Sequence, residues 1–215
     1  MKNINKVAVI GGTGKSGAYL VKELLSQNFK IKVLIRNPKK VPSAHPNMEV
    51  IIGDVLDKNA IQALITDSDG LISMLGMGIP YSEPTIFSKA TQVILEALST
   101  SKIKRFIVIT GLNVNTPSDQ KGEATQAATD WMHANYPVST QDRQLEYELL
   151  CASNLAWTLV RLPLIGQTEY APEISVSLTD CPGQHISATS LARFLIDILQ
   201  KEKHLKEAPF IANIG

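Results

Sequence analysis

The sequence predicts an α/β fold, in which helices cover both faces of a parallel sheet, and three observations lead to this prediction. Short apolar runs typical of strands alternate along the chain with longer segments whose apolar residues have helical spacing. The first run ends in glycines and continues directly into a helical pattern. The 215 residues are 44% hydrophobic and 19% charged, which is enough to bury one large core. We therefore predict one three-layer α/β/α domain, residues 1–215, with a doubly wound parallel sheet.

The composition gives no reason to expect a nucleic-acid or membrane partner. The formal net charge is +1, and the chain lacks both an apolar leader before the glycines and a span of about 20 apolar residues. Cys151 and Cys181 are too few and too far apart for a disulfide framework, and we interpret them as reduced thiols. We expect a cytoplasmic protein, monomeric or a small homo-oligomer, that acts on a small molecule.

The first element is a strand over residues 6–10, followed by a turn at residues 11–17 and a helix. Glycines in the turn let the backbone bend sharply and lie against a ligand. The first N–H groups of the helix have no partner within the helix, and the helix dipole adds about half a positive charge there. An anionic phosphate group is the natural occupant of such a site.

Two nucleotide-binding motifs compete for this turn. Gly14-Lys15-Ser16 looks like the end of a P-loop, but a P-loop needs a glycine where this chain has Val9. The glycines at 12, 14 and 17 instead fit G-x-G-x-x-G, and those at 11, 14 and 17 fit G-x-x-G-x-x-G. The flanking strand and helix favour a Rossmann-like dinucleotide-binding domain, the alternative being a turn that only packs a helix on a sheet. The predicted phosphate-binding residues are Gly11, Thr13, Gly14, Lys15, Ser16 and Gly17.

Arg36 follows the second predicted strand, residues 31–35, at the position that selects the cofactor of a dinucleotide fold. An acidic residue there binds the ribose 2′-hydroxyl of NAD, whereas an arginine accommodates the 2′-phosphate of NADP. A guanidinium can bind a phosphate through two parallel hydrogen bonds, and Lys15 could add a second positive charge. We therefore predict NADP(H) in preference to NAD(H). The alternative is that Arg36, Lys39 and Lys40 form an ordinary solvated basic loop.

Two further strands end in residues suited to the rest of a dinucleotide. The run at residues 49–55 ends in Gly-Asp, and the Asp54 carboxylate could accept a hydrogen bond from the adenine amine. Capping of the next helix is the other role for this region, and Asp57 is the better cap. The buried strand at residues 70–78 runs into glycines, which permit close backbone approach to a ligand. The candidates here are Asp54, Val55, Leu75, Gly76 and Met77.

The second half of the chain continues the alternation. We expect a helix over 86–98, a strand at 105–111, a helix over 139–152, a strand at 157–161, a helix from Ser187 or Thr189 and a last strand within 208–214. Residues 113–138 form a long excursion, polar at first and then helix-like, and such excursions at a strand's carboxyl end tend to cover a substrate site. We predict that this excursion borders the substrate site, with Trp131 and His133 as candidate contacts. Packing of Trp131 and Met132 against the body is the alternative.

An ordered set of short motifs runs through nearly the whole chain: 11–17, 33–36, 53–55, 75–76, 108–110 and 157–163. This set resembles the atypical short-chain dehydrogenase/reductase families of NAD(P)H-binding and NmrA-like proteins, and among them the biliverdin reductase B (flavin reductase) group. The resemblance implies that Thr13 to Ser16 hold the pyrophosphate and Arg36 the 2′-phosphate. It also implies a nicotinamide end made by Thr110, Gly111, Arg143, Leu162, Pro163, Leu164 and Ile165.

The departures from that family bear on the chemistry. Catalytic short-chain dehydrogenases carry Tyr-x-x-x-Lys on the helix before the sixth strand, but here that place reads Ser139-Thr140-Gln141-Asp142-Arg143. The family's serine after the fifth strand is replaced by Thr110, so Thr110 and Arg143 are the candidate catalytic residues. Arginine keeps its proton at any working pH and cannot act as a proton donor in turnover. Tyr147 lies one turn further along the same helix face, where it either substitutes for the missing tyrosine or packs.

These features favour a reductase that transfers hydride from NADP(H) to a conjugated acceptor of flavin or quinone type. Reduction of a simple ketone needs an acid for the emerging alkoxide, and the sequence offers none. A non-catalytic NADP(H)-binding redox sensor of NmrA-like type is the alternative, and a nucleotide-sugar epimerase is a third hypothesis. We expect no metal site, because the four histidines are dispersed without ligand spacing.

Overall fold

The computed structural model describes residues 4–78 and 81–214, and within them the strands form an eight-stranded sheet and a two-stranded sheet. The strands are β1 (Lys6–Ile10), β2 (Lys30–Ile35), β3 (Met48–Ile52), β4 (Gly70–Ser73), β5 (Arg105–Gly111), β6 (Ala156–Leu162), β7 (Leu164–Gly166), β8 (Ile174–Ser177), β9 (His185–Ser187) and β10 (Phe210–Asn213). The α-helices are α1 (Gly17–Ser26), α2 (Lys58–Ile65), α3 (Ile86–Ser99), α4 (Glu123–Asn135), α5 (Pro137–Ala152) and α6 (Ala188–Gln200), and a short 3₁₀ helix, η1, spans Pro38–Lys40.

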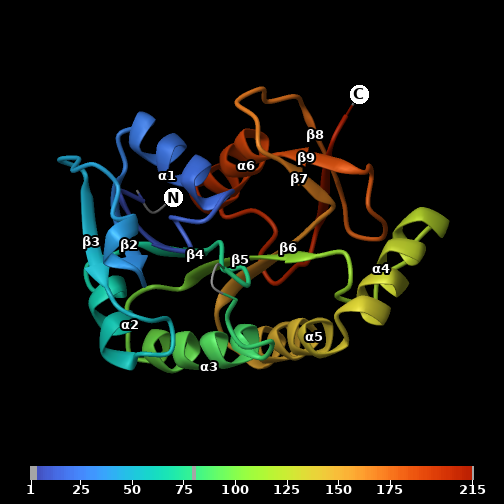
Figure 1. Ribbon diagram of the computed structural model, residues 1–215, viewed down its shortest axis with the longest axis horizontal. Helices are drawn as coiled ribbons and strands as arrows, with labels where there is room; N and C mark the ends of the chain where they lie inside the picture. Colours follow the sequence, from blue (N-terminus) through green and yellow to red (C-terminus); the bar gives the residue numbers. More distant parts are fainter. Residues whose placement is uncertain (1–3, 79–80, 215) are drawn as a thin grey trace.

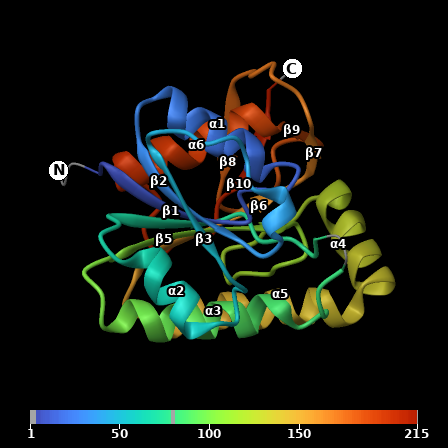
Figure 2. The same cartoon turned by 60° about the vertical axis from the view of Figure 1, so that its left-hand side comes forward.

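The large sheet has the order β3-β2-β1-β4-β5-β6-β10-β8, and every neighbouring pair is parallel except β10 with β8. Helices α1 and α6 cover one face, and α2, α3 and α5 cover the other (Figures 1 and 2). Each face buries its own apolar core, and the central strands β1, β4, β5 and β6 contribute side chains to both cores. The predicted fold class, a doubly wound three-layer α/β/α arrangement, is confirmed.

The topology fixes where a ligand can lie. The chain passes from β1 outward to β2 and β3, then returns to the other side of β1 for β4 and continues to β5 and β6. The connections therefore diverge between β1 and β4 and leave a crevice outside the carboxyl ends of these strands. The glycine turn at residues 11–17 follows β1 at this point.

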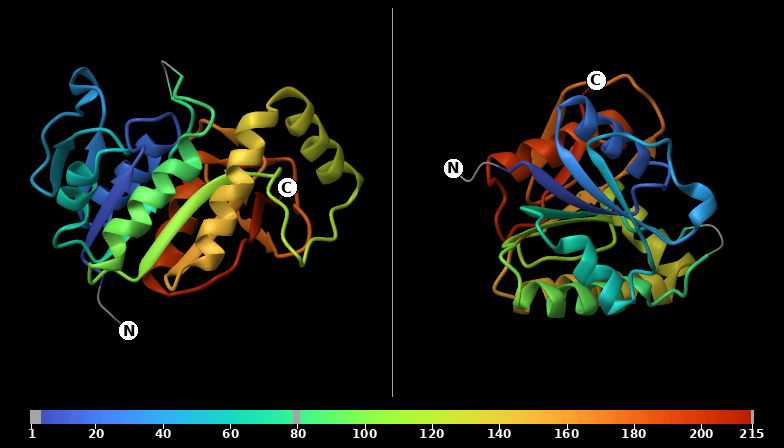
Figure 3. Two further views of the ribbon diagram at one scale, coloured as in Figure 1. Left: turned by 90° about the horizontal axis from the view of Figure 1, so that it is seen from below. Right: turned by 90° about the vertical axis from the view of Figure 1, so that its left-hand side faces the viewer.

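Side-chain caps account for the starts of α2 and α6. Asp57 accepts a hydrogen bond from the Asn59 N–H at 2.8 Å and caps α2, as predicted, and Ser187 caps α6 by accepting from Ser190 N–H at 3.1 Å. Helices α3 and α5, predicted separately, run side by side beneath the sheet, and α4 projects from the end of α5 (Figure 3).

Some strands differ from the prediction. Strand β4 stops at Ser73, because residues 74–78 leave the sheet to line the crevice. The segment between residues 162 and 187, for which the sequence predicts no strand, contains β7, β8 and β9. These strands are three or four residues long and pair with partners distant in sequence, so their local pattern is too short to reveal them.

Candidate functional site

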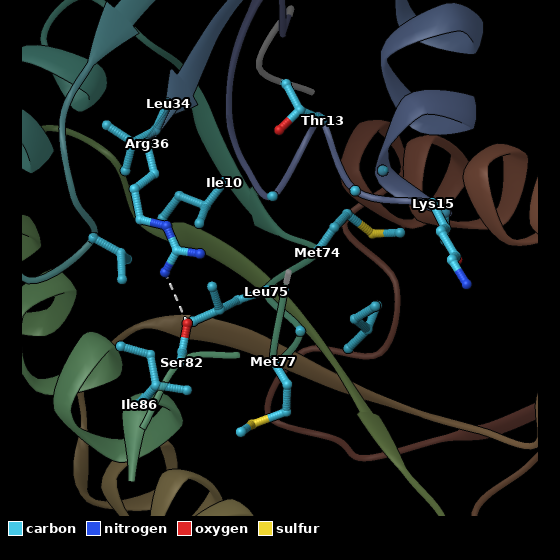
Figure 4. A pocket seen from close by; sticks show the side chains of 18 of the residues that line it. Ile10, Thr13, Lys15, Leu34, Arg36, Met74, Leu75, Met77, Ser82 and Ile86 are labelled. Carbon is cyan, nitrogen blue, oxygen red and sulfur yellow. Dashed lines mark hydrogen bonds between the residues drawn. The ribbon is translucent and has the colours of Figure 1, made fainter. Parts of the chain in front are cut away.

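A cavity of about 810 Å³ lies along the carboxyl ends of β1, β2, β4, β5 and β6, a size suited to a large organic ligand. It is lined by every predicted cofactor-binding residue except Leu164, and its close-up is shown in Figure 4. The lining comprises Ile10, Gly11, Thr13, Gly14, Lys15, Ser16, Gly17, Leu34, Arg36, Asn37, Lys40, Gly53, Asp54, Val55, Met74, Leu75, Gly76, Met77, Gly78, Tyr81, Ser82, Ile86, Ile109, Thr110, Gly111, Arg143, Leu162, Pro163 and Ile165.

The glycine turn is built from close backbone approaches. Gly11 has a φ of +76°, and a Cβ there would lie 2.5 Å from the carbonyl oxygen of Met74. A Cβ at Gly17 would lie 2.1 Å from the Gly11 oxygen, so the start of α1 touches the end of β1. A Cβ at Gly14 would meet only the Gly11 carbonyl oxygen, at 3.1 Å. The turn is therefore closed on the protein side at Gly11 and Gly17, while Gly14 leaves room beside the cavity.

The amino end of α1 has features that suit an anion. Ser16 stands at the N-cap, but its side chain makes no capping hydrogen bond, and the first turn holds no acidic residue. The N–H groups of Ala18 and Tyr19 donate to the carbonyl oxygens of Gly14 at 3.0 Å and Ser16 at 3.2 Å, and the helix dipole favours negative charge at this end of α1. Together with the room beside Gly14, this arrangement fits the diphosphate of a dinucleotide.

Arg36 and Lys15 lie on opposite sides of the glycine turn. The Arg36 guanidinium donates a hydrogen bond to the Ser82 hydroxyl oxygen at 2.9 Å, whereas the Lys15 side chain extends away from Arg36 (Figure 4). That Lys15 shares one phosphate with Arg36 stays a prediction. Lys40, four residues after Arg36, is the second cationic residue that lines the cavity beyond β2.

Asp54 lines the cavity and also stabilises its own turn. Its carboxylate accepts a hydrogen bond from the Leu56 N–H at 3.0 Å, while Asp57 performs the helix capping. The contact between Asp54 and an adenine amine stays a prediction.

Thr110 presents an unusual buried hydroxyl at the other end of the cavity. The residue is 4% exposed, lines the cavity at the end of β5, and its Oγ1 has no hydrogen-bond partner. The Oγ1 atom itself is closed off from the cavity, so it makes no ligand contact in this conformation, although leaving a buried hydroxyl unpaired costs about 1–3 kcal/mol. In the β5–β6 register Thr110 is paired with Arg161, and Gly111 is paired with Leu162.

Arg143 lines the same end but is already held by the protein. Its guanidinium donates to the carbonyl oxygens of Leu75 at 2.8 Å and Ile109 at 3.1 Å, and forms a 2.7 Å ion pair with Glu146. It also stacks on the ring of Phe87, with Cζ 3.3 Å from the centroid. Arg143 therefore joins α5 to the ends of β4 and β5 and fixes the wall of the cavity.

Tyr147 does not replace the missing tyrosine. It packs edge-on against Trp157, with ring centroids 5.9 Å apart, and belongs to the apolar core beneath the sheet. Burial raises the pKa of Tyr147 to about 12, and a hydrogen bond with Cys151 acts in the same direction. The packing interpretation of this residue is the correct one.

Leu164 and Trp131, both predicted to contact a ligand, do not line the cavity. Leu164 is 71% exposed and does not line the cavity, because alternate residues of β7 face opposite sides and Ile165 is the one that faces inward. In the excursion at 113–138, no residue lines the cavity, and Trp131 is 58% exposed. Met132 packs close to Gly111, so the excursion abuts the cavity rim at one point. That it borders the substrate stays a prediction.

Sequence reasoning missed several lining residues, among them Ile10, Leu34, Lys40, Ser82 and Ile86. Ile10 and Leu34 lie at the carboxyl ends of β1 and β2, where the carboxyl-end rule could have found them, whereas Ile86 is the first residue of α3. Ser82 carries no motif, and only the fold brings it to the cavity.

The described part of the chain contains neither a metal-binding cluster nor a membrane-spanning helix. No group of three or more histidine, cysteine, aspartate or glutamate residues within it could hold a metal ion. None of the helices described is both long enough and apolar enough to cross a membrane.

Similar proteins share this architecture. A short-chain dehydrogenase/reductase from Veillonella parvula, solved in complex with NADP, superimposes with a TM-score of 0.81 at 18% identity, covering 99% of this chain and 96% of that one. A protein from Streptococcus pneumoniae provisionally described as an NADH-flavin reductase gives a TM-score of 0.77 at 22% identity, covering 98% and 100%. At these identities the likeness shows the fold.

Among curated proteins, the chloroplastic protein TIC 62 of Pisum sativum is 27% identical over 183 residues, which are 74% of this chain and 33% of that protein. This chain covers less than half the length of the curated relatives reported by the comparison, from 18% to 42%. A model of one family, described as NAD(P)H-binding, matches residues 11–202, from the glycine turn to just past α6. The chain therefore belongs to the NAD(P)H-binding family, as its motifs predicted.

Proposed function

We propose that this protein is an NADP(H)-dependent reductase that transfers hydride to a conjugated acceptor of flavin or quinone type. One observation carries the proposal: at the end of the cavity beyond β5 and β6, the place of the Tyr-x-x-x-Lys pair is taken by Arg143, whose guanidinium is held by Leu75, Ile109 and Glu146. Arg36 supports the preference for NADP(H), because a guanidinium suits a 2′-phosphate.

The polar groups restrict the reaction. When bound, the reduced nicotinamide supplies the hydride, and the oxidised cofactor leaves after turnover. A ketone would need a proton at its oxygen during transfer, and Arg143 cannot release one. A flavin or quinone spreads the developing negative charge over a conjugated system and takes its proton from water afterwards. The missing acid therefore selects acceptors that do not need it.

Each part of the cavity then has a separate task. The glycine turn and the amino end of α1 hold the diphosphate, and Arg36 holds the 2′-phosphate. Arg143 holds the carbonyl oxygens of Leu75 and Ile109 and so keeps the two strand ends at a fixed separation. The chain thus acts by positioning.

The S. pneumoniae and V. parvula structures support the same class, the first through its description as a flavin reductase and the second through its bound NADP. A non-catalytic NADP(H) sensor is the second candidate. It is favoured by the same engaged Arg143, since a site without any mobile proton donor also suits a protein that only binds the cofactor.

An acceptor panel tests the proposal. Oxidation of NADPH is followed with flavin mononucleotide, quinones and a tetrazolium dye, beside simple ketones and aldehydes, with Gly14→Val as the control for contaminating reductases. We expect turnover with at least one conjugated acceptor, none with the ketones and none with the variant. Tight NADPH binding without turnover on any acceptor would favour the sensor, and failure to bind NADPH would refute both.

A further inference from the structure

A hydrogen bond across the cavity joins two segments that are far apart in the chain. Arg36 lies just after β2, and Ser82 lies in the connection between β4 and α3, yet the Arg36 guanidinium and the Ser82 hydroxyl oxygen are 2.9 Å apart. Both residues line the cavity, and Figure 4 shows the contact as a dashed line from Arg36 to Ser82. The Arg36 guanidinium is thus held in place by the Ser82 hydroxyl on the opposite wall of the cavity.

The backbone holds Ser82 in this place. The Ser82 N–H donates to the Met77 carbonyl oxygen at 2.7 Å, and α3 starts four residues later at the buried Ile86. The start of α3 is anchored in turn by Asp142 of α5, whose carboxylate accepts hydrogen bonds from the Phe87 N–H at 2.8 Å and the Ser88 N–H at 3.2 Å. The Ser82 hydroxyl is therefore presented by a supported wall of the cavity.

A serine hydroxyl can do two things beside a guanidinium and a phosphate. It has one donor hydrogen and two acceptor lone pairs, so it can accept from Arg36 and still donate to a phosphate oxygen. Arginine loses side-chain conformational entropy when it is immobilised, and a contact that orients it beforehand reduces the part lost on binding. An unphosphorylated ribose hydroxyl gains much less from either effect, because it carries no charge.

We infer that Ser82 is a specificity-determining residue, which together with Arg36 forms a subsite for the 2′-phosphate of the cofactor. This inference rests on the proposed use of NADP(H) and adds a residue that neither the motifs nor their spacing suggested. The alternative is that the hydrogen bond from Arg36 to Ser82 crosses the space that the adenosine half of the cofactor needs, in which case this bond hinders cofactor binding. The two arrangements predict opposite signs for removal of the hydroxyl.

Binding of nucleotide fragments distinguishes them. The dissociation constants of 2′,5′-ADP and 5′-ADP are measured by calorimetry for the wild type, Ser82→Ala, Ser82→Thr and Ser99→Ala, the last being a serine on the exposed part of α3 that is absent from the cavity lining. We expect Ser82→Ala to weaken 2′,5′-ADP binding about tenfold, as for loss of a hydrogen bond to a charged group, and to change 5′-ADP binding less than about twofold. Ser82→Thr keeps a hydroxyl and should retain most of the preference, and Ser99→Ala should match the wild type.

A double-mutant cycle with Arg36→Ala adds a second readout. If Ser82 acts through Arg36 and the phosphate together, Ser82→Ala should have less than about a twofold effect once Arg36 is removed. An unchanged ratio of the two dissociation constants, or tighter binding of both fragments by Ser82→Ala, would overturn the inference while leaving the NADP(H) proposal intact. Equal binding of the two fragments by the wild type would instead refute the NADP(H) preference itself, and the inference with it.

Discussion

Substitution of Gly14 by valine separates binding from folding more clearly than any other change in the glycine turn. A Cβ at this position meets only the Gly11 carbonyl oxygen, at 3.1 Å, and Gly14 lines the cavity. At Gly17, by contrast, a Cβ would lie 2.1 Å from the Gly11 oxygen and 3.0 Å from the Cα of Gly12. A side chain at 14 therefore fills ligand space, whereas a side chain at 17 forces the first helix away from the first strand.

The expected magnitudes follow from these contacts. Gly14→Val should change the free energy of unfolding by less than about 1 kcal/mol, since a small steric cost is offset by the lower entropy of the unfolded chain. If it blocks two hydrogen bonds to the charged diphosphate, at about 1.5–3 kcal/mol each, binding weakens by about 3–6 kcal/mol, or at least a hundredfold in Kd. Gly17→Ala should lower the free energy of unfolding by about 1–3 kcal/mol or more, as overpacking does.

Fluorescence titration with NADPH and thermal unfolding without ligand measure the two effects independently. We expect Gly14→Val to unfold near the wild-type temperature and to show no saturation by NADPH, and Gly17→Ala to unfold at a lower temperature. Wild-type affinity in Gly14→Val would refute the placement of the diphosphate in this turn. A large loss of stability in that variant would show that the space beside Gly14 is needed by the fold and not by a ligand.

Four further substitutions test single residues. Arg36→Ala should weaken NADPH binding by about 1–3 kcal/mol and barely affect NADH, and equal losses would remove the specificity argument. Thr110→Val removes a buried hydroxyl that has no partner, so the free energy of unfolding should not fall. Because that oxygen is closed off from the cavity, catalytic efficiency with NADPH should stay within about twofold of the wild type, and a tenfold loss would show that the hydroxyl contacts a ligand. In Arg143→Lys the ammonium group cannot make both contacts, to Leu75 and to Ile109, so the free energy of unfolding should fall by about 1–3 kcal/mol. We expect this variant to retain some turnover, and complete inactivation of the folded variant would indicate a direct ligand contact. Tyr147→Phe should leave the pH profile of turnover unchanged. Burial raises the pKa of Tyr147 from 10.0 to about 12, so the wild type, but not the variant, should lose stability from this group as the pH rises through that interval. Identical alkaline unfolding curves for the two proteins would contradict this pKa shift.

The alternation of strands and helices was sufficient to predict the architecture and most of the cavity lining. Apolar periodicity reports burial directly, and parallel strands place their carboxyl ends at one edge, so a list of strand ends is nearly a list of lining residues. Local capping was equally predictable for Asp57 and Ser187, because a cap depends on residues two or three positions away.

The prediction for Leu164 failed for a different reason. Leu164 lies in the right segment, but pairing of β7 with β9 turns it outward. Its position along the chain was right, and the direction of its side chain was decided by a strand about 20 residues further along the chain.

The sequence alone determined the fold class, the glycine turn at residues 11–17, the family and the absence of the Tyr-x-x-x-Lys pair, because each depends on residue types at short, regular spacing. Only the tertiary structure decided that Arg143 is bound to the ends of two strands, that the Thr110 hydroxyl is left without a partner and that Ser82 meets Arg36. These are contacts between segments up to 68 residues apart, and their geometry comes from the packing of helices on the sheet, which local periodicity does not encode.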